Sequence, residues 1–142
     1  MLDLKLLATW NDFEIIERAI MVDFTCIYHA SDKNLRNVWP NKLHSEVLEL
    51  IVDWEFFTGK EDVLDDWLVS SVWEFDTGVN VFATEWGDKT STIFVHGGVD
   101  RAIYEVKNIV LFNSGKREER VIKYVIDNQT GRRDDLNVIH IY

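Results

Sequence analysis

Apolar residues recur at helical spacing in the first half of the chain. Residues 13–20 mix apolar and charged side chains after Asn11 and Asp12, either of which can cap the N-terminus of a helix. The preceding stretch, residues 2–10, fits a strand or a short helix. Residues 21–29 are rich in β-branched and aromatic side chains, which predicts a strand.

A longer helix is predicted to begin at Pro40, because proline suits the first helical position and this is the only proline in the chain. Gly59 would end it. Its apolar stripe consists of Leu43, Val47, Leu50, Ile51, Trp54 and Phe57, while Glu46, Glu49 and Asp53 fall on another face. A second helix is predicted over residues 61–70, with Val63, Leu64, Trp67 and Leu68 on one side and Glu61, Asp62, Asp65 and Asp66 on the other.

After residue 70, β-branched and aromatic residues predict strands separated by turns. The strands are expected at residues 71–75, 78–86, 90–96, 102–112, 118–127 and 136–142. Gly87 and Asp88 mark a hairpin, and residues 113–116 and 128–135 mark two further turns. The stretch 102–112 also fits a helix, but we favour a strand. Helices followed by a meander predict an α+β fold, with two or three N-terminal helices packed on a C-terminal, mostly antiparallel sheet.

Length and composition predict a single domain over residues 1–142. The chain has 142 residues, of which 46% are hydrophobic, enough to bury a substantial core. Its one cysteine, Cys26, excludes an internal disulfide and lies in an apolar run, which favours a buried structural thiol. The N-terminus lacks a signal-peptide pattern, and no apolar run has the length of a membrane span. We therefore expect a soluble, cytoplasmic protein.

Charge is unevenly distributed along a chain whose formal net charge is −10. Residues 46–88 hold twelve acids and one base, Lys60, whereas residues 101–133 hold eight bases and four acids. The acidic balance disfavours direct binding to nucleic acid through phosphate contacts. It favours a basic protein partner, because a surface of one sign attracts a partner of the opposite sign. The alternative explanation is acidity that serves only solubility.

Large aromatic residues lie among these acids. Exposed tryptophans beside a charged rim are typical of interface hot spots, whereas buried tryptophans would only fill the core. For binding a basic partner, the candidate residues are Glu46, Glu49, Asp53, Glu61, Asp62, Asp65, Asp66 and Trp67, followed by Glu74 and Asp76.

The sequence carries little sign of catalysis. Its four histidines, His29, His44, His96 and His140, are scattered, and neither HExxH nor CxxC occurs, so no metal or cofactor is predicted. His96 precedes two glycines, with Asp100 nearby, and this pair could act as a general base. A histidine at the end of a strand before a turn is the more ordinary interpretation. We do not expect an enzyme.

The profile of the chain is short, acidic, poor in cysteine, rich in aromatics and free of catalytic motifs. It is similar to that of small bacterial immunity proteins and related toxin inhibitors. This resemblance implies an inhibitory binding protein that blocks a basic toxin domain, plausibly a nuclease. Three alternatives stay open: a phage-type mimic of nucleic acid, a small α+β enzyme using His96 and Asp100, and a subunit of an oligomer.

Overall fold

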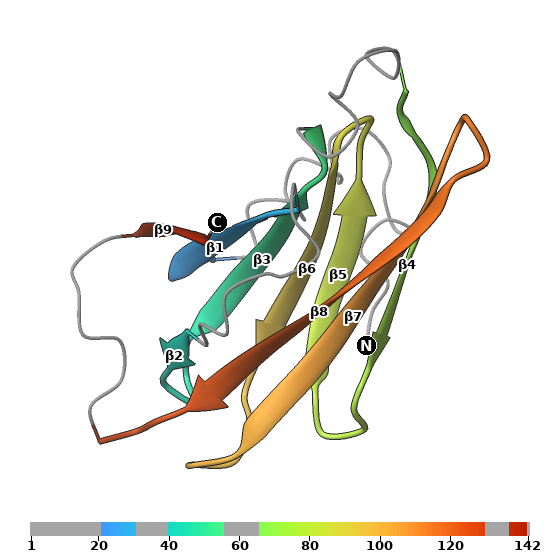
Figure 1. The fold of residues 1–142 in the computed structure, drawn as a ribbon. Helices are drawn as coiled ribbons and strands as arrows, with labels where there is room; N and C mark the ends of the chain where they lie inside the picture. Colours follow the sequence, from blue (N-terminus) through green and yellow to red (C-terminus); the bar gives the residue numbers. More distant parts are fainter. Residues whose placement is uncertain (1–20, 31–39, 56–65, 130–136, 142) are drawn as a thin grey trace, which may run out of the picture.

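Two β-sheets packed face to face form the body of the protein (Figure 1). The structure is a computed structural model that describes residues 21–30, 40–55, 66–129 and 137–141. One sheet has five strands in the order β5-β6-β3-β1-β9, and the other has four in the order β2-β8-β7-β4. The strands are β1 (Phe24–His29), β2 (Asn41–Lys42), β3 (Val47–Asp53), β4 (Leu68–Phe75), β5 (Asn80–Trp86), β6 (Thr90–His96), β7 (Ile103–Phe112), β8 (Arg117–Ile126) and β9 (Val138–Ile141).

Both sheets mix parallel and antiparallel pairs. In the five-stranded sheet, β1 runs parallel to both β3 and β9, and β6 runs antiparallel to both β3 and β5. In the four-stranded sheet, β7 runs antiparallel to β4 and β8, and the short β2 runs parallel to β8. Among the described residues no helix is long and apolar enough to cross a membrane.

The predicted α+β fold is wrong, because none of the elements formed by the described residues is a helix. The helix predicted to begin at Pro40 and to end at Gly59 is wrong over its described part, where β2 and β3 form. Residues 68–70 of the second predicted helix begin β4, and residues 61–65 lie outside the described residues. The helix predicted over residues 13–20, and the strand or helix over residues 2–10, also lie outside them.

Most of the predicted strands are confirmed, but the predicted order in which they pair is wrong. Strands were expected where β1 and β4 to β9 form, and the hairpins β5–β6 and β7–β8 are confirmed. The single meander is wrong, because β4 pairs with β7 and not with β5. The strand β9 pairs in parallel with β1 in the other sheet, so the chain crosses between sheets after β8.

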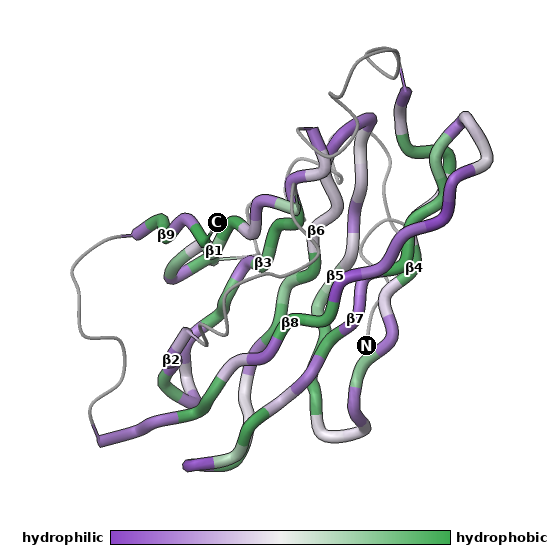
Figure 2. The backbone as a smooth tube through the Cα atoms, in the orientation of Figure 1, coloured by the Kyte–Doolittle hydropathy of each residue, from purple (hydrophilic) through white to green (hydrophobic). Residues whose placement is uncertain are grey.

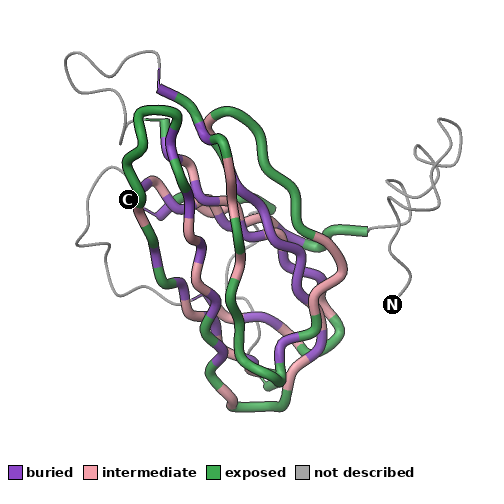
Figure 3. Tube along the Cα trace, turned by 90° about the vertical axis from the view of Figure 1, so that its right-hand side faces the viewer, coloured by how far each residue is buried: buried purple, intermediate pink, exposed green. Residues whose placement is uncertain are grey.

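The core lies between the sheets, and strands such as β7 and β8 supply it with alternate residues. Along β8 the inward positions Ile122, Tyr124 and Ile126 are almost fully buried, while Val121 points outward and is 43% exposed. Figure 2 shows the corresponding alternation of hydrophilic and hydrophobic positions, and Figure 3 shows buried and exposed positions alternating along the strands. This period of two is the geometry of a strand with one face on a core.

A buried polar network joins the two sheets near the end of β3 and the start of β6. Asn108 of β7 accepts a hydrogen bond from Trp54 Nε1 at 3.0 Å. Its amide nitrogen donates to Ser71 Oγ of β4 and Ser91 Oγ of β6, at 3.0 and 3.1 Å. Trp73 Nε1 also donates to Ser91 Oγ, at 3.0 Å. Because the buried groups satisfy one another across the interface, the network fixes how β4 lies against the five-stranded sheet.

Candidate partner-binding surface

The acids predicted on the first helix lie on or beside β3, and their carboxylates bind neighbouring groups. Glu46 Oε1 accepts a hydrogen bond from Leu43 N at 2.7 Å. Glu49 Oε1 accepts one from Thr25 Oγ1 at 2.7 Å. The Asp53 carboxylate lies 3.2 Å from His29 Nδ1, and its side chain is 16% exposed. These three acids are half-buried and hold the turn and strands around β3 together.

Of the four acids predicted on the second helix, only Asp66 lies among the described residues. Glu61, Asp62 and Asp65 lie outside the described residues. Asp66 is only 6% exposed, and its carboxylate accepts hydrogen bonds from Ser114 N and Ser114 Oγ at 3.0 and 2.6 Å. Asp66 therefore connects the start of β4 to the β7–β8 turn, and both of its carboxylate oxygens accept hydrogen bonds within the protein. The adjacent Trp67, by contrast, is 41% exposed.

The exposed candidates gather along one side of the sandwich, where the edge strands β4 and β5 lie (Figure 1). We call this surface the β4–β5 side and define it by Trp67, Glu74, Phe75, Asp76, Glu85, Trp86 and Asp88, all of which are exposed. Phe75 and Trp86 are each 47% exposed. Leu68 N donates to Asp88 O at 2.8 Å, which places Trp67 at the same end of this side as the β5–β6 turn.

Acids outnumber bases on the β4–β5 side, and the base nearest to it in sequence is Lys89, which follows Asp88. Residues 66–88 contain no lysine or arginine. Lys107 Nζ of β7 lies 3.8 Å from Glu74 Oε1, and the Glu74 side chain remains 62% exposed. The five-stranded sheet continues this trend, since its strands carry Glu49, Asp53 and Glu85 but no lysine or arginine.

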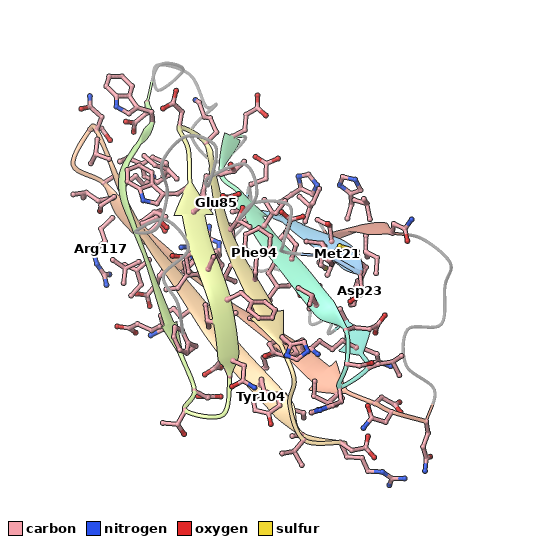
Figure 4. The ribbon with its side chains drawn as sticks, turned by 180° about the vertical axis from the view of Figure 1, so that it is seen from behind. Met21, Asp23, Glu85, Phe94, Tyr104 and Arg117 are labelled. Carbon is pink, nitrogen blue, oxygen red and sulfur yellow. The ribbon has the colours of Figure 1, made fainter. Side chains whose placement is uncertain are left out.

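Bases on the described strands belong to the four-stranded sheet. They are Lys42, Lys107, Arg117, Arg120 and Lys123. Figure 4 shows the two layers from behind, with Glu85 on β5 and Arg117 on β8. Arg120 is turned inward and 5% exposed, donating to Ala30 O at 3.1 Å and lying over the Trp54 ring at 5.0 Å. The bipolar charge of the sequence thus becomes a difference between the two sheets.

The four histidines, scattered in the sequence, form two pairs in the structure. His29 Nε2 lies 2.9 Å from His140 Nδ1, and the ring centroids are 5.2 Å apart. The difference between these distances is about two ring radii, so the nitrogens lie in line between the centroids, as in a direct N–H···N hydrogen bond. The Asp53 carboxylate lies 3.2 Å from the other nitrogen of His29, so this row of three side chains connects the ends of three parallel strands.

The second pair lies at the opposite ends of the strands. His44 Nδ1 is 2.6 Å from Gly98 O, and its ring centroid is 6.4 Å from that of His96. Burial, with smaller effects from Lys42 and His44, lowers the pKa of His96. Asp100 Oδ1 instead accepts a hydrogen bond from Asn128 N at 2.9 Å. His96 therefore packs against His44 and Phe82, while Asp100 stabilises the loop after β8. Within the described ranges, no group of three or more His, Cys, Asp or Glu residues is arranged to hold a metal ion.

Comparison with known proteins adds little to this geometry. No family model and no curated protein match the chain. Among solved structures it is similar to the solution structure of the PKD domain from KIAA 1837 protein, with a TM-score of 0.39 and 15% sequence identity. That match covers 72% of this chain and 94% of the other. The similarity is too low to carry an argument about function.

Proposed function

We propose that this chain is a binding protein without catalytic chemistry of its own, which takes a basic protein partner on the β4–β5 side. The observation that carries the proposal is the exposure of three aromatic side chains, Trp67, Phe75 and Trp86, on a surface whose own chain segment holds acids and no bases. Aromatic anchors supply affinity at an interface, and complementary charge speeds association and selects the partner.

The specific form that we propose is an inhibitor of a basic toxin domain, acting in the cytoplasm. Such an inhibitor needs only to cover the toxin's active site or substrate groove. A mimic of nucleic acid is the weaker alternative, because the four-stranded sheet exposes bases such as Arg117, which is 61% exposed at its side chain. A mimic would present acids over an extended surface instead.

A charge-reversal experiment tests the proposal. Affinity capture from native-host lysate, followed by purification of the captured protein, supplies the partner for rate measurements. Glu74→Lys combined with Glu85→Lys should slow association by at least about tenfold at low salt, with a smaller effect at high salt. Glu105→Lys combined with Glu119→Lys is the matched control, because it changes net charge equally on the inner strands β7 and β8 and leaves the edge strands β4 and β5 unchanged.

Equal association rates for both double variants would contradict the proposed surface. A captured partner that is acidic would contradict the proposed charge complementarity. The inhibitory role is tested separately by expressing the purified partner's gene with and without this chain. Cells that grow equally well in both cases would contradict the role of toxin inhibitor.

A further inference from the structure

Four strands form the edges of the two sheets, and β4 differs from the other three. Within the described residues, β2 has two residues and β9 has four, too few to pair with a long segment. The edge strand β5 has seven, but a register shift between Val81 and Ala83 interrupts it. In β4 the shift lies near its start, between Leu68 and Ser70, and residues 70–75 then run without interruption. Short edges and bulges are common protections against pairing with other chains, and residues 70–75 lack them.

The backbone of β4 presents unpaired groups at this edge. Asp76 N donates to Glu105 O, so the alternation of an antiparallel ladder makes Glu74, Val72 and Ser70 the residues bonded to β7. The N–H and C=O groups of Ser71, Trp73 and Phe75 then point away from β7. Leu68, before the bulge, also points its N–H away from β7, and Asp88 O accepts it. In the part of the chain that the structure describes, the three later residues have no such backbone partner.

The side chains along β4 favour a strand of a particular composition. Val72 is 54% exposed on the outer face, and Phe75 is 47% exposed on the face directed between the sheets. Glu74 lies on the outer face two residues after Val72, and β4 carries no lysine, arginine or proline. An added strand would gain most by placing a basic side chain beside Glu74 on the outer face and an apolar side chain beside Phe75 on the opposite face. Val72, on the same face as Glu74, would then contact the aliphatic part of a neighbouring lysine.

We propose that β4 recognises an extended, basic segment of the partner by adding it to the four-stranded sheet as a fifth strand. This inference rests on the proposed function and specifies how the partner is held: backbone hydrogen bonds bind the segment, and its charge selects it. A second copy of this chain fits the edge less well, because two β4–β5 sides would bring acids against acids without a base from residues 66–88.

Amide hydrogen exchange followed by NMR tests the added strand. The probe is a seven-residue peptide of alternating valine and lysine with blocked ends. At saturating peptide, exchange at Ser71, Trp73 and Phe75 should slow by about tenfold or more, because only these amides gain a partner. Exchange at Ser70, Val72 and Glu74, already bonded to β7, should change far less. Protection centred elsewhere, or equal protection by a peptide with glutamate in place of lysine, would overturn the proposal. So would equal protection by a peptide with N-methylated backbone amides.

A pair of variants isolates the backbone contribution. Phe75→Pro and Phe75→Ala both remove the ring, but only proline also removes the N–H that points away from β7. Edge strands tolerate proline at such a position, so both variants should fold. Phe75→Pro should bind the valine–lysine peptide about tenfold more weakly than Phe75→Ala, while both keep the same thermal unfolding midpoint within a few degrees. If the two folded variants bind the peptide equally, strand addition is wrong.

The same two variants separate this inference from the proposed function. Capture of the partner that depends on Glu74 and Glu85, but not on the choice between proline and alanine at Phe75, would refute strand addition and leave the binding surface intact. Loss of the dependence on Glu74 and Glu85 would refute the surface itself. Sedimentation that shows dimers, with Ser71, Trp73 and Phe75 protected without any peptide, would make a second copy the occupant and overturn the proposal.

Discussion

Asn108→Ala should be among the most destabilising single substitutions in the sheets, because it removes the centre of the network that joins them. Asn108 is fully buried and bonds Trp54, Ser71, Ser91 and the carbonyl of Val72. The two serine hydroxyls remain bonded to each other at 2.5 Å after the change, but Trp54 Nε1 loses Asn108 Oδ1 as its acceptor at 3.0 Å.

The expected loss of stability can be estimated from the hydrogen bonds that Asn108→Ala removes. Two to three net hydrogen bonds contribute about 1 kcal/mol each, and the loss of Asn108 Oδ1 as acceptor for the buried indole donor of Trp54 costs about 1–3 kcal/mol more. We therefore expect the free energy of unfolding to fall by about 4 kcal/mol. Urea denaturation followed by tryptophan fluorescence measures it, and the unchanged slope with denaturant checks that unfolding remains two-state.

A double-mutant cycle with Trp54→Phe tests the cause of the loss. Phenylalanine has no N–H, so in the Asn108→Ala background it removes the donor whose hydrogen bond to Asn108 Oδ1 is already lost, and the two costs should be less than additive by about 1–2 kcal/mol. Asn113→Ala, in the exposed β7–β8 turn, is the control and should cost less than about 0.5 kcal/mol. A cost for Asn108→Ala below about 1.5 kcal/mol, or strict additivity in the cycle, would refute the reasoning.

Two further predictions concern buried titratable groups. Burial lowers the pKa of Lys42 to about 8 from its ordinary 10.5, so between these values the unfolded chain binds more protons than the folded one. The free energy of unfolding should rise by about 2 kcal/mol from about pH 7.5 to about pH 9.5, and Lys42→Met, though less stable, should lack this rise; equal slopes for the two proteins would contradict it. Burial also raises the pKa of the Cys26 thiol to about 12. Cys26 should therefore react with a thiol reagent at least about a hundredfold more slowly in the native protein than in denaturant, and comparable rates would show that the thiol is accessible.

The strands after residue 70 could be predicted because their local signals agree. Alternating β-branched and aromatic residues there are separated by turn residues such as Gly87 and Asp88, and Gly115 adopts a positive φ in the β7–β8 turn. A hairpin pairs neighbours in sequence, so local patterns also predicted its partner strands. The pairing of β4 with β7 depends on packing across the whole sandwich, and no local pattern encodes it.

The helix predicted around β3 is wrong because a strand in the middle of a sheet can be apolar on both faces. Leu48, Leu50 and Val52 face the core, yet Val47 on the opposite face is only 8% exposed. An apolar run of this kind matches the helical period as well as the period of two. Pairing with β1 and β6 on either side decides in favour of the strand.

Some residues of the candidate surface could be predicted from the sequence, and others could not. Trp67, Glu74 and Asp76 were candidates from their place in the acidic segment, and they are exposed on the β4–β5 side. Glu85 was not a candidate, and Trp86 was one of several tryptophans expected to act as an anchor only if exposed; only the fold shows that it is 47% exposed and places β5 on the same side as β4. The histidine pairs could not be predicted either, because His29 and His140 are 111 positions apart and only the fold brings them together.

The structure also changes what the net charge of −10 means for a partner. Glu46, Glu49 and Asp66 use their carboxylates within the fold, so these acids stabilise strands and turns and are poorly placed to meet a second protein. Glu74 and Glu85 are exposed on the two edge strands. Steering depends on charges that a partner can approach, so association should respond to these few acids much more strongly than to an equal number chosen from the whole chain. The position of an acid in the sheets, more than the total charge, therefore determines whether it contributes to binding.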